Sequence, residues 1–397
     1  MMLISDEWRS GRGGLSTMNR ELATALASAG VETAVMVPRS TDEDIKAASD
    51  VDVALVTPAS IPGLNSRELL LLRPVFADSS WEPDVIIGHG RVLGSYAAAQ
   101  KQQFFSRARR VHFVHTDAEQ LEAAKEMPGG TSRMASADER RNLERDLARS
   151  ADLVVGVGPM LTATITDDLI GLSPRPKIMC MVPGLRSAFD PASASPPVRN
   201  ALLVVGRADD FQSKGIDIVA DALLKVVDRW PQSRPHPPVL VLRGVPGEAA
   251  TDVKARLDEI FEGRVAYHLR PYSDSEELVK QDLAQSRVML MPSRHEGFGL
   301  AAFEAIASDI PVLISAESGL AQFLRESHID TEPSSIVTTR NTSTRLAIDE
   351  WADAIWYVLT HPAPSRAQAH EMRKRLSEIV DWRTAVDYLL AELDGLD

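Results

Sequence analysis

Short apolar runs alternate along the chain with longer stretches in which apolar residues recur every three or four positions. The first pattern is typical of buried strands and the second of amphipathic helices. Regular alternation of the two predicts parallel sheets joined by right-handed helical crossovers, and therefore an α/β fold. The predicted strands are 2–4, 31–37, 51–56, 85–87, 111–114, 153–155, 201–205, 239–242, 265–267, 288–291 and 312–315.

The strand–helix pattern stops once and then restarts, which indicates two domains. Residues 191–197 are rich in Pro and Ser, as linkers often are, and a new apolar run begins at Ala201. A chain of 397 residues also exceeds what one hydrophobic core usually supports. We therefore expect an N-terminal domain over 1–195 and a C-terminal domain over 196–378.

Composition and charge exclude several function classes. The formal net charge of −13 argues against non-specific nucleic-acid binding, which needs Lys and Arg against phosphate. Cys180 is the single cysteine, which excludes internal disulfides and cysteine-based zinc sites and fits a reducing compartment. The first residues lack the apolar core of a signal peptide, and no apolar run approaches the length of a membrane span. We expect a cytoplasmic protein.

Two carboxylates follow the predicted strand 288–291. Glu296 lies in a short loop bordered by Gly297 and Gly299, and Glu304 lies about one turn into a predicted helix over 300–307. Loops at the carboxyl ends of strands are where open α/β sheets place their ligands. Glycines there permit a sharp reversal and let a ligand approach the backbone.

The start of that predicted helix is suited to phosphate. A helix N-terminus presents N–H groups without intrahelical partners and carries a partial positive charge. The amides concerned belong to Phe298, Gly299 and Leu300. With Glu304 placed to reach a ribose, the stretch predicts a site for a phosphorylated, sugar-bearing ligand.

Two cations accompany a second strand end. Gly206 and Arg207 follow the predicted strand 201–205, and Lys214 precedes a predicted helix over 216–227. Arg can bind a diphosphate bidentately, and both cations supply countercharge. The alternative is that Arg207 and Lys214 are ordinary solvated charges.

These residues together resemble the E-x7-E motif and the G-R…K-G pair of GT4-type retaining glycosyltransferases. The string P-S-x-x-E-G-F-G-L-x-x-x-E, from Pro292 to Glu304, carries most of the resemblance. It implies a GT-B fold, with two Rossmann-like domains facing each other across a cleft and a C-terminal helix, about 379–397, that packs back on the first domain. It also implies transfer of a hexosyl or N-acetylhexosaminyl group from a nucleotide-diphosphate sugar to an acceptor hydroxyl.

The resemblance assigns roles to the motif residues. It places Glu296 by the donor sugar, Glu304 on the nucleotide ribose, and Arg207 and Lys214 on the donor diphosphate. The nucleotide sugar is a substrate, so no cofactor is expected. We also expect no metal, because the closest acidic pair, Asp209 and Asp210, lies beside Arg207 and forms no D-x-D motif.

Residues of the first half extend the predicted site. Gly13 and Gly14 resemble the glycine loop that closes over the donor phosphates in this family, although a glycine pair before a helix is also an ordinary tight turn. His115 follows the predicted strand 111–114, where the family often has a histidine that contacts the donor sugar. A lone histidine can equally be structural. His89 and Arg91 follow the strand 85–87 and are candidates for facing the acceptor.

A basic cluster from Lys101 to Arg110 contains two aromatic residues. We favour a solvated helix face with a buried Phe pair, and expect at most a weak peripheral membrane contact there.

Two features depart from the family pattern. Arg207 and Lys214 are farther apart than is usual, and the stretch from Ser318 to Gln322 lacks the common Gly-Gly and Glu. A glycoside phosphorylase on the same fold, or a catalytically silent sugar-nucleotide-binding protein, remains an alternative. The sequence does not specify the sugar, the base, the acceptor or the oligomeric state.

Overall fold

The structure is a computed structural model, and its polypeptide forms two compact units. The described residues are 1–9, 14–117, 120, 130–173, 175–186, 200–273, 275–330, 333–340 and 344–396. Unit 1 comprises Met1–Glu119, Thr131–Gly184 and Val380–Asp397, and unit 2 comprises Gln120–Gly130 and Leu185–Ile379. Gly13 and the predicted linker 191–197 lie outside the described residues.

Unit 1 is built on a sheet of eight described strands, in the order β4-β3-β2-β1-β5-β6-β7-β8. All neighbours run parallel except β4, which pairs antiparallel with β3 at the edge. The strands are β1 (Met2–Ile4), β2 (Thr33–Met36), β3 (Val53–Pro58), β4 (Pro74–Val75), β5 (Val85–His89), β6 (Arg109–Val114), β7 (Leu153–Val157) and β8 (Lys177–Met181).

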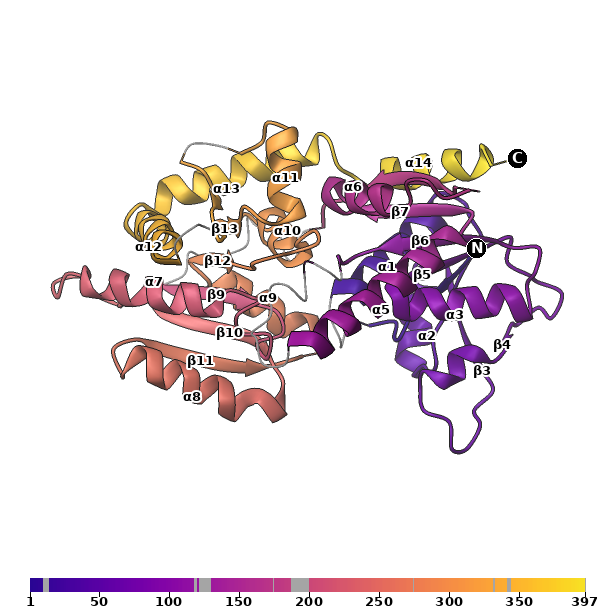
Figure 1. Cartoon of the computed structure of the whole chain (residues 1–397), viewed down its shortest axis with the longest axis horizontal. Helices are drawn as coiled ribbons and strands as arrows, with labels where there is room; N and C mark the ends of the chain where they lie inside the picture. Colours follow the sequence, from indigo (N-terminus) through magenta and orange to yellow (C-terminus); the bar gives the residue numbers. More distant parts are fainter. Residues whose placement is uncertain are drawn as a thin grey trace. The chain divides into compact units, whose positions relative to one another are not determined.

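Helices cover this parallel sheet (Figure 1). They include α1 (Gly14–Ser28), α2 (Asp42–Ser49), α3 (Gly90–Gln103), α5 (Gly130–Arg149) and α6 (Pro159–Asp168). Because helices screen both faces, the central strands are buried throughout, as in β1, β2, β5 and β7. The buried stripe of α1 includes Met18, Leu22 and Leu26, which matches the predicted helical spacing.

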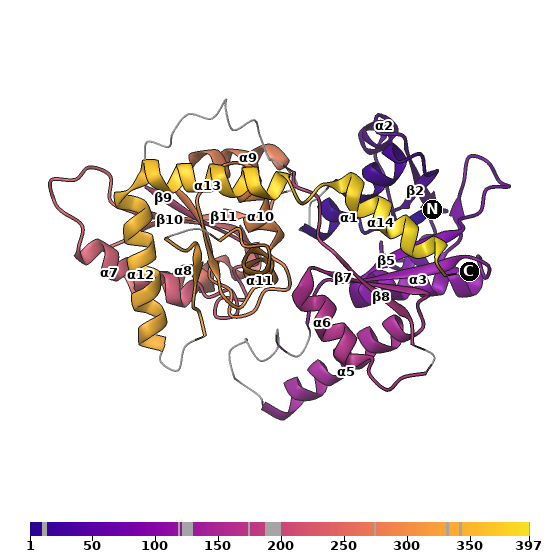
Figure 2. The ribbon, with the colours of Figure 1, turned by 90° about the horizontal axis from the view of Figure 1, so that it is seen from above.

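The C-terminal helix α14 (Trp382–Asp394) belongs to unit 1 although it follows unit 2 in the sequence. It packs against α1, and Figure 2 shows the two helices side by side. Arg109 donates from Nη1 to the carbonyl oxygen of Leu393 at 2.5 Å, and Lys177 pairs with Glu392 at 2.9 Å. These contacts tie the end of the chain to the strands β6 and β8.

Unit 2 is built on a parallel sheet of six described strands, in the order β11-β10-β9-β12-β13-β14. The strands are β9 (Ala201–Val205), β10 (Val239–Val245), β11 (Ala266–Pro271), β12 (Val288–Met291), β13 (Val312–Ser315) and β14 (Ile336–Val337). Its helices include α7 (Ile216–Asp228), α8 (Ala250–Phe261), α9 (Glu276–Gln285), α10 (Leu300–Ala307), α11 (Gly319–Glu326), α12 (Thr344–Thr360) and α13 (Pro362–Ser377). The strand order reverses between β9 and β12, which is the topological switch point of a doubly wound sheet.

Strand boundaries differ from the predicted ones where turns intervene. The run predicted to start at Val51 enters β3 only at Val53, because Asp52 adopts a left-handed conformation with φ 57°. β8 was not predicted, and its residues alternate between buried and half-buried positions at the sheet edge. The helix predicted over 300–307 coincides with α10.

Two glycines permit close backbone packing near the switch point of unit 2. Gly215 has φ +65°, and a Cβ atom there would lie 2.0 Å from the carbonyl oxygen of Pro292. A Cβ at Gly319 would lie 2.1 Å from the carbonyl oxygen of Gly297. Three chain segments therefore meet here at distances that no side chain allows.

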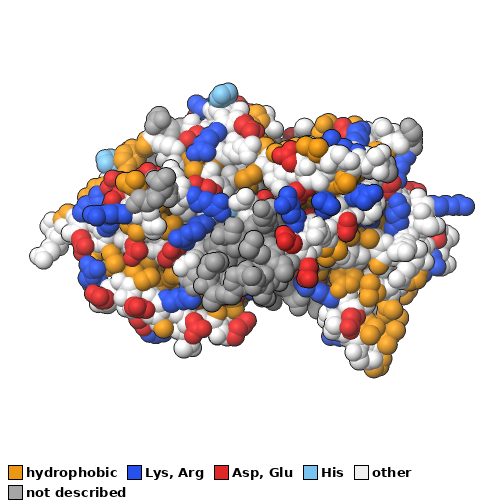
Figure 3. All heavy atoms as spheres, viewed as in Figure 1, with side chains coloured by type: hydrophobic (Ala, Val, Ile, Leu, Met, Phe, Trp, Pro, Cys, Tyr) orange, Lys and Arg blue, Asp and Glu red, His pale blue; other side chains and the backbone are white. Residues whose placement is uncertain are grey.

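The edge of the sheet in unit 1 carries exposed apolar side chains. Ile61, Leu71 and Val75 are exposed near β4, and hydrophobic side chains gather over this region in Figure 3. The edge strand β4 is two residues long and begins with Pro74, which limits pairing with another chain. No helix among the described residues is long and apolar enough to cross a membrane.

We predict that Gly215→Ala destabilises the protein by at least about 2 kcal/mol, because it adds left-handed strain to a clash with the Pro292 carbonyl. Thermal unfolding would show an apparent Tm lower by several degrees. Gly247→Ala is the matched control, since a Cβ there meets nothing within 4 Å. Equal Tm values for Gly215→Ala and Gly247→Ala would contradict this packing.

Candidate active site

The candidate site lies at the carboxyl ends of two neighbouring strands, β9 and β12, in unit 2. Gly206 and Arg207 follow β9 directly, and Glu296 lies in the loop between β12 and α10. β9 and β12 pair in parallel, so their ends lie side by side at the switch point. Open α/β sheets bind ligands at this position.

Lys214 and Glu296 form an ion pair at the centre of this edge. Lys214 Nζ donates to Glu296 Oε2 at 2.8 Å, although 82 residues separate the two in the sequence. The Ser293 hydroxyl donates to the same oxygen at 3.1 Å. Each charged side chain is about a quarter exposed, at 24%, so the pair is partly desolvated and still open to a ligand.

Burial and pairing act in opposite directions on these two groups. Burial disfavours the carboxylate, but attraction to Lys214 and hydrogen bonds from Lys214 and Ser293 outweigh it and lower the pKa of Glu296. Burial likewise disfavours the ammonium, and the attraction to Glu296 outweighs it, so the pKa of Lys214 is raised. Both groups are therefore charged at neutral pH.

Arg207 is held by a carboxylate from its own loop. Its Nη2 and Nε donate to Asp209 at 2.6 and 3.3 Å, and the guanidinium remains 67% exposed. A carboxylate that accepts two N–H groups from one guanidinium occupies the geometry that a phosphate would use. Asp209 belongs to the segment that lengthens the Arg207–Lys214 spacing. Its carboxylate therefore competes with an incoming phosphate for the Arg207 guanidinium.

The Glu296 loop is held by Glu317 and by the first residues of α11. Glu296 N–H donates to the Glu317 carbonyl at 3.3 Å, and Gly319 N–H donates to the Glu296 carbonyl at 3.0 Å. Leu320 N–H donates to the Phe298 carbonyl at 2.8 Å. The stretch that departs from the family pattern thus fixes the position of the Glu296 loop.

The first turn of α10 contributes backbone rather than side chains. Gly299 caps the helix with φ 108°, and the N–H groups that open a helix have no intrahelical acceptor. The Phe298 side chain is buried and packs against the Phe303 ring at a centroid distance of 5.4 Å. Glu304 lies one turn further along α10 and is half-buried. The side chain of Phe298 is therefore unavailable to a ligand, and this residue can contribute only its backbone.

In unit 1, two predicted histidines form a pair. His89 ends β5 and His115 follows β6, and His89 Nδ1 lies 2.8 Å from His115 Nε2. Burial and repulsion from His112 lower the pKa of His115 to about 3, and burial and the neighbouring histidines lower that of His89 well below its usual value. Both rings are neutral at pH 7, so one donates and the other accepts. Gly14 is the exposed first residue of α1.

The basic cluster of residues 101–110 is largely used within the fold. Lys101 pairs with Asp152 at 2.7 Å, and Arg110 is buried and donates to Ser150 at 2.8 Å. Arg109 binds α14, as described above, and Phe105 is buried while Phe104 is half-buried. The predicted solvated helix face is wrong, because α3 ends at Gln103 and both Arg109 and Arg110 lie on β6. The predicted burial of the Phe pair is confirmed for Phe105 and only in part for Phe104, and a membrane contact stays a prediction.

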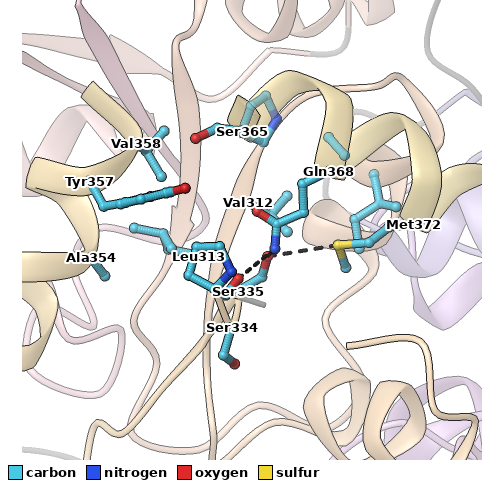
Figure 4. Close-up of a pocket in the computed structure, with 14 residues that line it drawn as sticks. Val312, Leu313, Ser334, Ser335, Ala354, Tyr357, Val358, Ser365, Gln368 and Met372 are labelled. Carbon is cyan, nitrogen blue, oxygen red and sulfur yellow. Dashed lines mark hydrogen bonds between the residues drawn. The ribbon is translucent and has the colours of Figure 1, made fainter. Parts of the chain in front are cut away.

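A cavity of about 40 Å³ lies at the opposite edge of the sheet in unit 2. Val312 and Ser335 line it near the start of β13 and β14, and Tyr357, Gln368 and Met372 enclose it from α12 and α13 (Figure 4). Its volume suits a water molecule and is far below that of a nucleotide site. It is distinct from the candidate active site.

Sequence reasoning missed a pair that supports the site. Arg294 occupies a variable position of the P-S-x-x-E string, and it binds Asp217 at the start of α7. A charged residue inside the motif, and an acidic residue shortly after Lys214, were the available signals. No group of three His, Cys, Asp or Glu in the described part of the chain is arranged to hold a metal ion.

Comparison with known proteins identifies the family. A model of the family described as "Family 4 Glycosyltransferase in conflict systems" matches residues 2–389. The chain belongs to this glycosyltransferase family. The predicted resemblance to GT4-type enzymes is confirmed, and the chain is an enzyme that transfers a sugar from a nucleotide-sugar donor.

Curated relatives of this glycosyltransferase are similar over most of their length. The chain is 27% identical to a glycogen synthase of Mycobacterium tuberculosis over 401 aligned residues, covering 94% of this chain and 88% of the relative. It is also 27% identical to a D-inositol 3-phosphate glycosyltransferase of Jonesia denitrificans over 334 aligned residues, covering 78% and 76% respectively.

Solved structures share the fold of the glycosyltransferase. A sucrose-phosphate synthase from Thermosynechococcus elongatus has a TM-score of 0.71 at 21% identity, with 100% of this chain and 99% of that chain covered. Anabaena HepE, solved with UDP and glucose, has a TM-score of 0.67 at 16% identity, with 99% of both chains covered. The predicted GT-B fold, with two Rossmann-like domains, is confirmed.

We predict that Lys214→Met lowers the Tm at pH 7 by a few degrees, and that this loss shrinks on acidification. The folded-state pKa of Glu296 is depressed, so its pairing stabilises the fold above the unfolded-state value of about 4.3 and is lost as the pH falls through the folded value. Calorimetric melting of both proteins between pH 7 and pH 3 measures the difference. Lys254→Met, which breaks an exposed pair, is the control and should change little. A Tm difference for Lys214→Met that is constant with pH would contradict the pairing.

Proposed function

We propose that this glycosyltransferase moves a hexosyl group from a nucleoside diphosphate sugar to an acceptor hydroxyl with retention of configuration. One observation carries the proposal. Lys214, Arg207 and the N-terminus of α10 converge on the switch point of unit 2, next to the ionised Glu296. Positive groups of three kinds at one sheet edge match a ligand that has a diphosphate.

The two cations bind the donor diphosphate and stabilise the charge that grows on it as the glycosidic bond breaks. Lys214 supplies a partly desolvated ammonium, and Arg207 supplies a guanidinium that can bind phosphate bidentately. Asp209 must release Arg207 when the diphosphate arrives. Donors that are already positioned before the reaction are commonly the largest catalytic contribution.

Glu296 acts on the sugar, and Glu304 acts on the ribose. The ionised carboxylate of Glu296 orients the sugar and stabilises the positive charge of an oxocarbenium-like transition state. The acceptor hydroxyl attacks from the face that the diphosphate leaves, and its proton passes to an oxygen of the departing diphosphate. Gly13, Gly14 and His115 are further residues that we propose to bind the donor.

UDP is the first nucleotide to test. Solved relatives include Anabaena HepE with UDP and glucose, and Staphylococcus aureus TarM with UDP. The names of the curated relatives, glycogen synthase and D-inositol 3-phosphate glycosyltransferase, favour an acceptor that is a sugar or a polyol. We propose a cytoplasmic location, which the single cysteine supports.

We predict that Glu296→Gln keeps the fold and lowers turnover roughly 100-fold, on the scale of losing one positioned electrostatic partner. The assay follows release of nucleoside diphosphate from a panel of UDP-, GDP- and ADP-sugars with sugar and polyol acceptors. Glu259→Gln, an exposed change on α8, is the control. A kcat for Glu296→Gln near that of the wild type would exclude the proposed role.

We predict that transfer continues in EDTA. Lys214 and Arg207 provide the countercharge that a metal would otherwise bring to the diphosphate. Initial rates before and after chelation should agree within about twofold, a difference below roughly 0.5 kcal/mol in the barrier. Activity lost in EDTA and restored by Mg²⁺ or Mn²⁺ would contradict metal independence.

A further inference from the structure

Arg294 joins the two loops that carry Lys214 and Glu296. Its Nη1 and Nη2 donate to the two carboxylate oxygens of Asp217 at 2.8 and 2.6 Å. Its backbone N–H donates to the Ser213 carbonyl at 2.9 Å, and Nη1 also donates to the Gln212 carbonyl. One residue of the Glu296 loop therefore binds three residues of the segment that carries Lys214, namely Gln212, Ser213 and Asp217.

The geometry makes this contact stronger than an ordinary surface ion pair. The fork of the guanidinium meets the carboxylate in a bidentate arrangement, and the side chains of Arg294 and Asp217 are 21% and 25% exposed. Asp217 lies in the first turn of α7, where the helix N-terminus attracts a carboxylate. Both partners are therefore held before any ligand arrives.

The contact lies beside the reactive groups without including them. Arg294 precedes Glu296 by two residues, and its backbone bonds to Ser213, the neighbour of Lys214. Its guanidinium is engaged by the Asp217 carboxylate and the Gln212 carbonyl, so it acts through the loops rather than by binding the donor. The close packing of Gly215 on the Pro292 carbonyl joins the same two loops at a second point.

We infer that Arg294 and Asp217 are positioning residues, which fix the distance between Lys214 and Glu296 and so set the affinity for the donor diphosphate. This inference rests on the proposed function. It predicts different behaviour for two parts of the donor. Binding of the diphosphate depends on the Arg294–Asp217 contact, whereas binding of the nucleoside does not.

The test uses Arg294→Gln, Asp217→Asn and the double variant, each as the full chain. Calorimetry measures the Kd of UDP and of uridine. We expect each single variant to weaken UDP binding about tenfold, the loss of one charge-assisted contact, and to leave uridine binding within about twofold. The double variant should resemble either single variant, because all three remove one interaction.

Arg373→Gln is the matched control. Arg373 Nε donates to Asp309 at 2.6 Å, in a pair that is 30% and 11% exposed and lies in the same unit between α10 and α13. The Arg373→Gln variant should unfold more easily than the wild type but bind UDP with the same affinity. Equal losses of UDP affinity in Arg373→Gln and Arg294→Gln would overturn the inference, because general loosening would then explain both.

The remaining outcomes are also decisive. If Arg294→Gln fails to fold, Asp217→Asn carries the test, because it keeps the shape of the side chain and removes only its charge. Two results would overturn the inference and leave the proposed function standing. One is a UDP affinity of Asp217→Asn equal to that of the wild type, and the other is an equal loss of affinity for UDP and for uridine. A wild-type protein that binds none of UDP, GDP and ADP overturns the proposed function and this inference with it.

Discussion

The close contact between Gly215 and the carbonyl oxygen of Pro292 is the constraint on which the candidate site depends. A side chain at position 215 would place its Cβ 2.0 Å from that oxygen, so only glycine lets the two loops meet. Their meeting places the Lys214 ammonium 2.8 Å from the Glu296 carboxylate. The attraction between these two charges, which are far apart in the sequence, offsets the free-energy cost of removing each of them from water. Either charge alone would be strongly destabilising there.

The sheet of unit 2 explains why this contact forms where it does. β9 and β12 are neighbours in space, and between them in the sequence run the two strands and the helices of one wing of the sheet. Open α/β sheets bind their ligands at the carboxyl ends of the strands that flank such a switch point. Lys214, Arg207 and the start of α10 all follow these two strands. The reaction is inferred from the family, and this arrangement of side chains places positive charge where the donor diphosphate would bind.

The sequence predicted the parts of the fold that depend on local pattern. Three signals in the sequence indicate the same structure around Glu296: the spacing of apolar residues, the glycines and the charges. They made it possible to predict the strand 288–291, the helix 300–307 and the charged residues between them. β8 was missed because an edge strand is only partly buried, so its apolar pattern is weak. The late start of β3 reflects the left-handed Asp52, which no periodicity reveals.

The candidate site was predicted residue by residue, but not as a set of interactions. The motif identifies Glu296 and Lys214, whereas their ion pair depends on the tertiary approach of two loops. Arg294 and Asp217 were overlooked because each is only one charged residue in the sequence, and their pairing over 77 residues depends on the tertiary structure. Asp209 was noticed only as an acidic neighbour, and its hold on Arg207 requires the loop conformation.

The central claim is that Lys214 and Arg207 bind the diphosphate of a nucleotide-sugar donor. Its most direct test is calorimetry of UDP, GDP, ADP and their nucleosides with the wild type, Lys214→Ala and Arg207→Ala. We expect one nucleoside diphosphate to bind the wild type, and each variant to lose about tenfold or more in affinity for it while keeping its affinity for the nucleoside. Equal losses for the diphosphate and the nucleoside, or no binding of any nucleoside diphosphate by the wild type, would contradict the account.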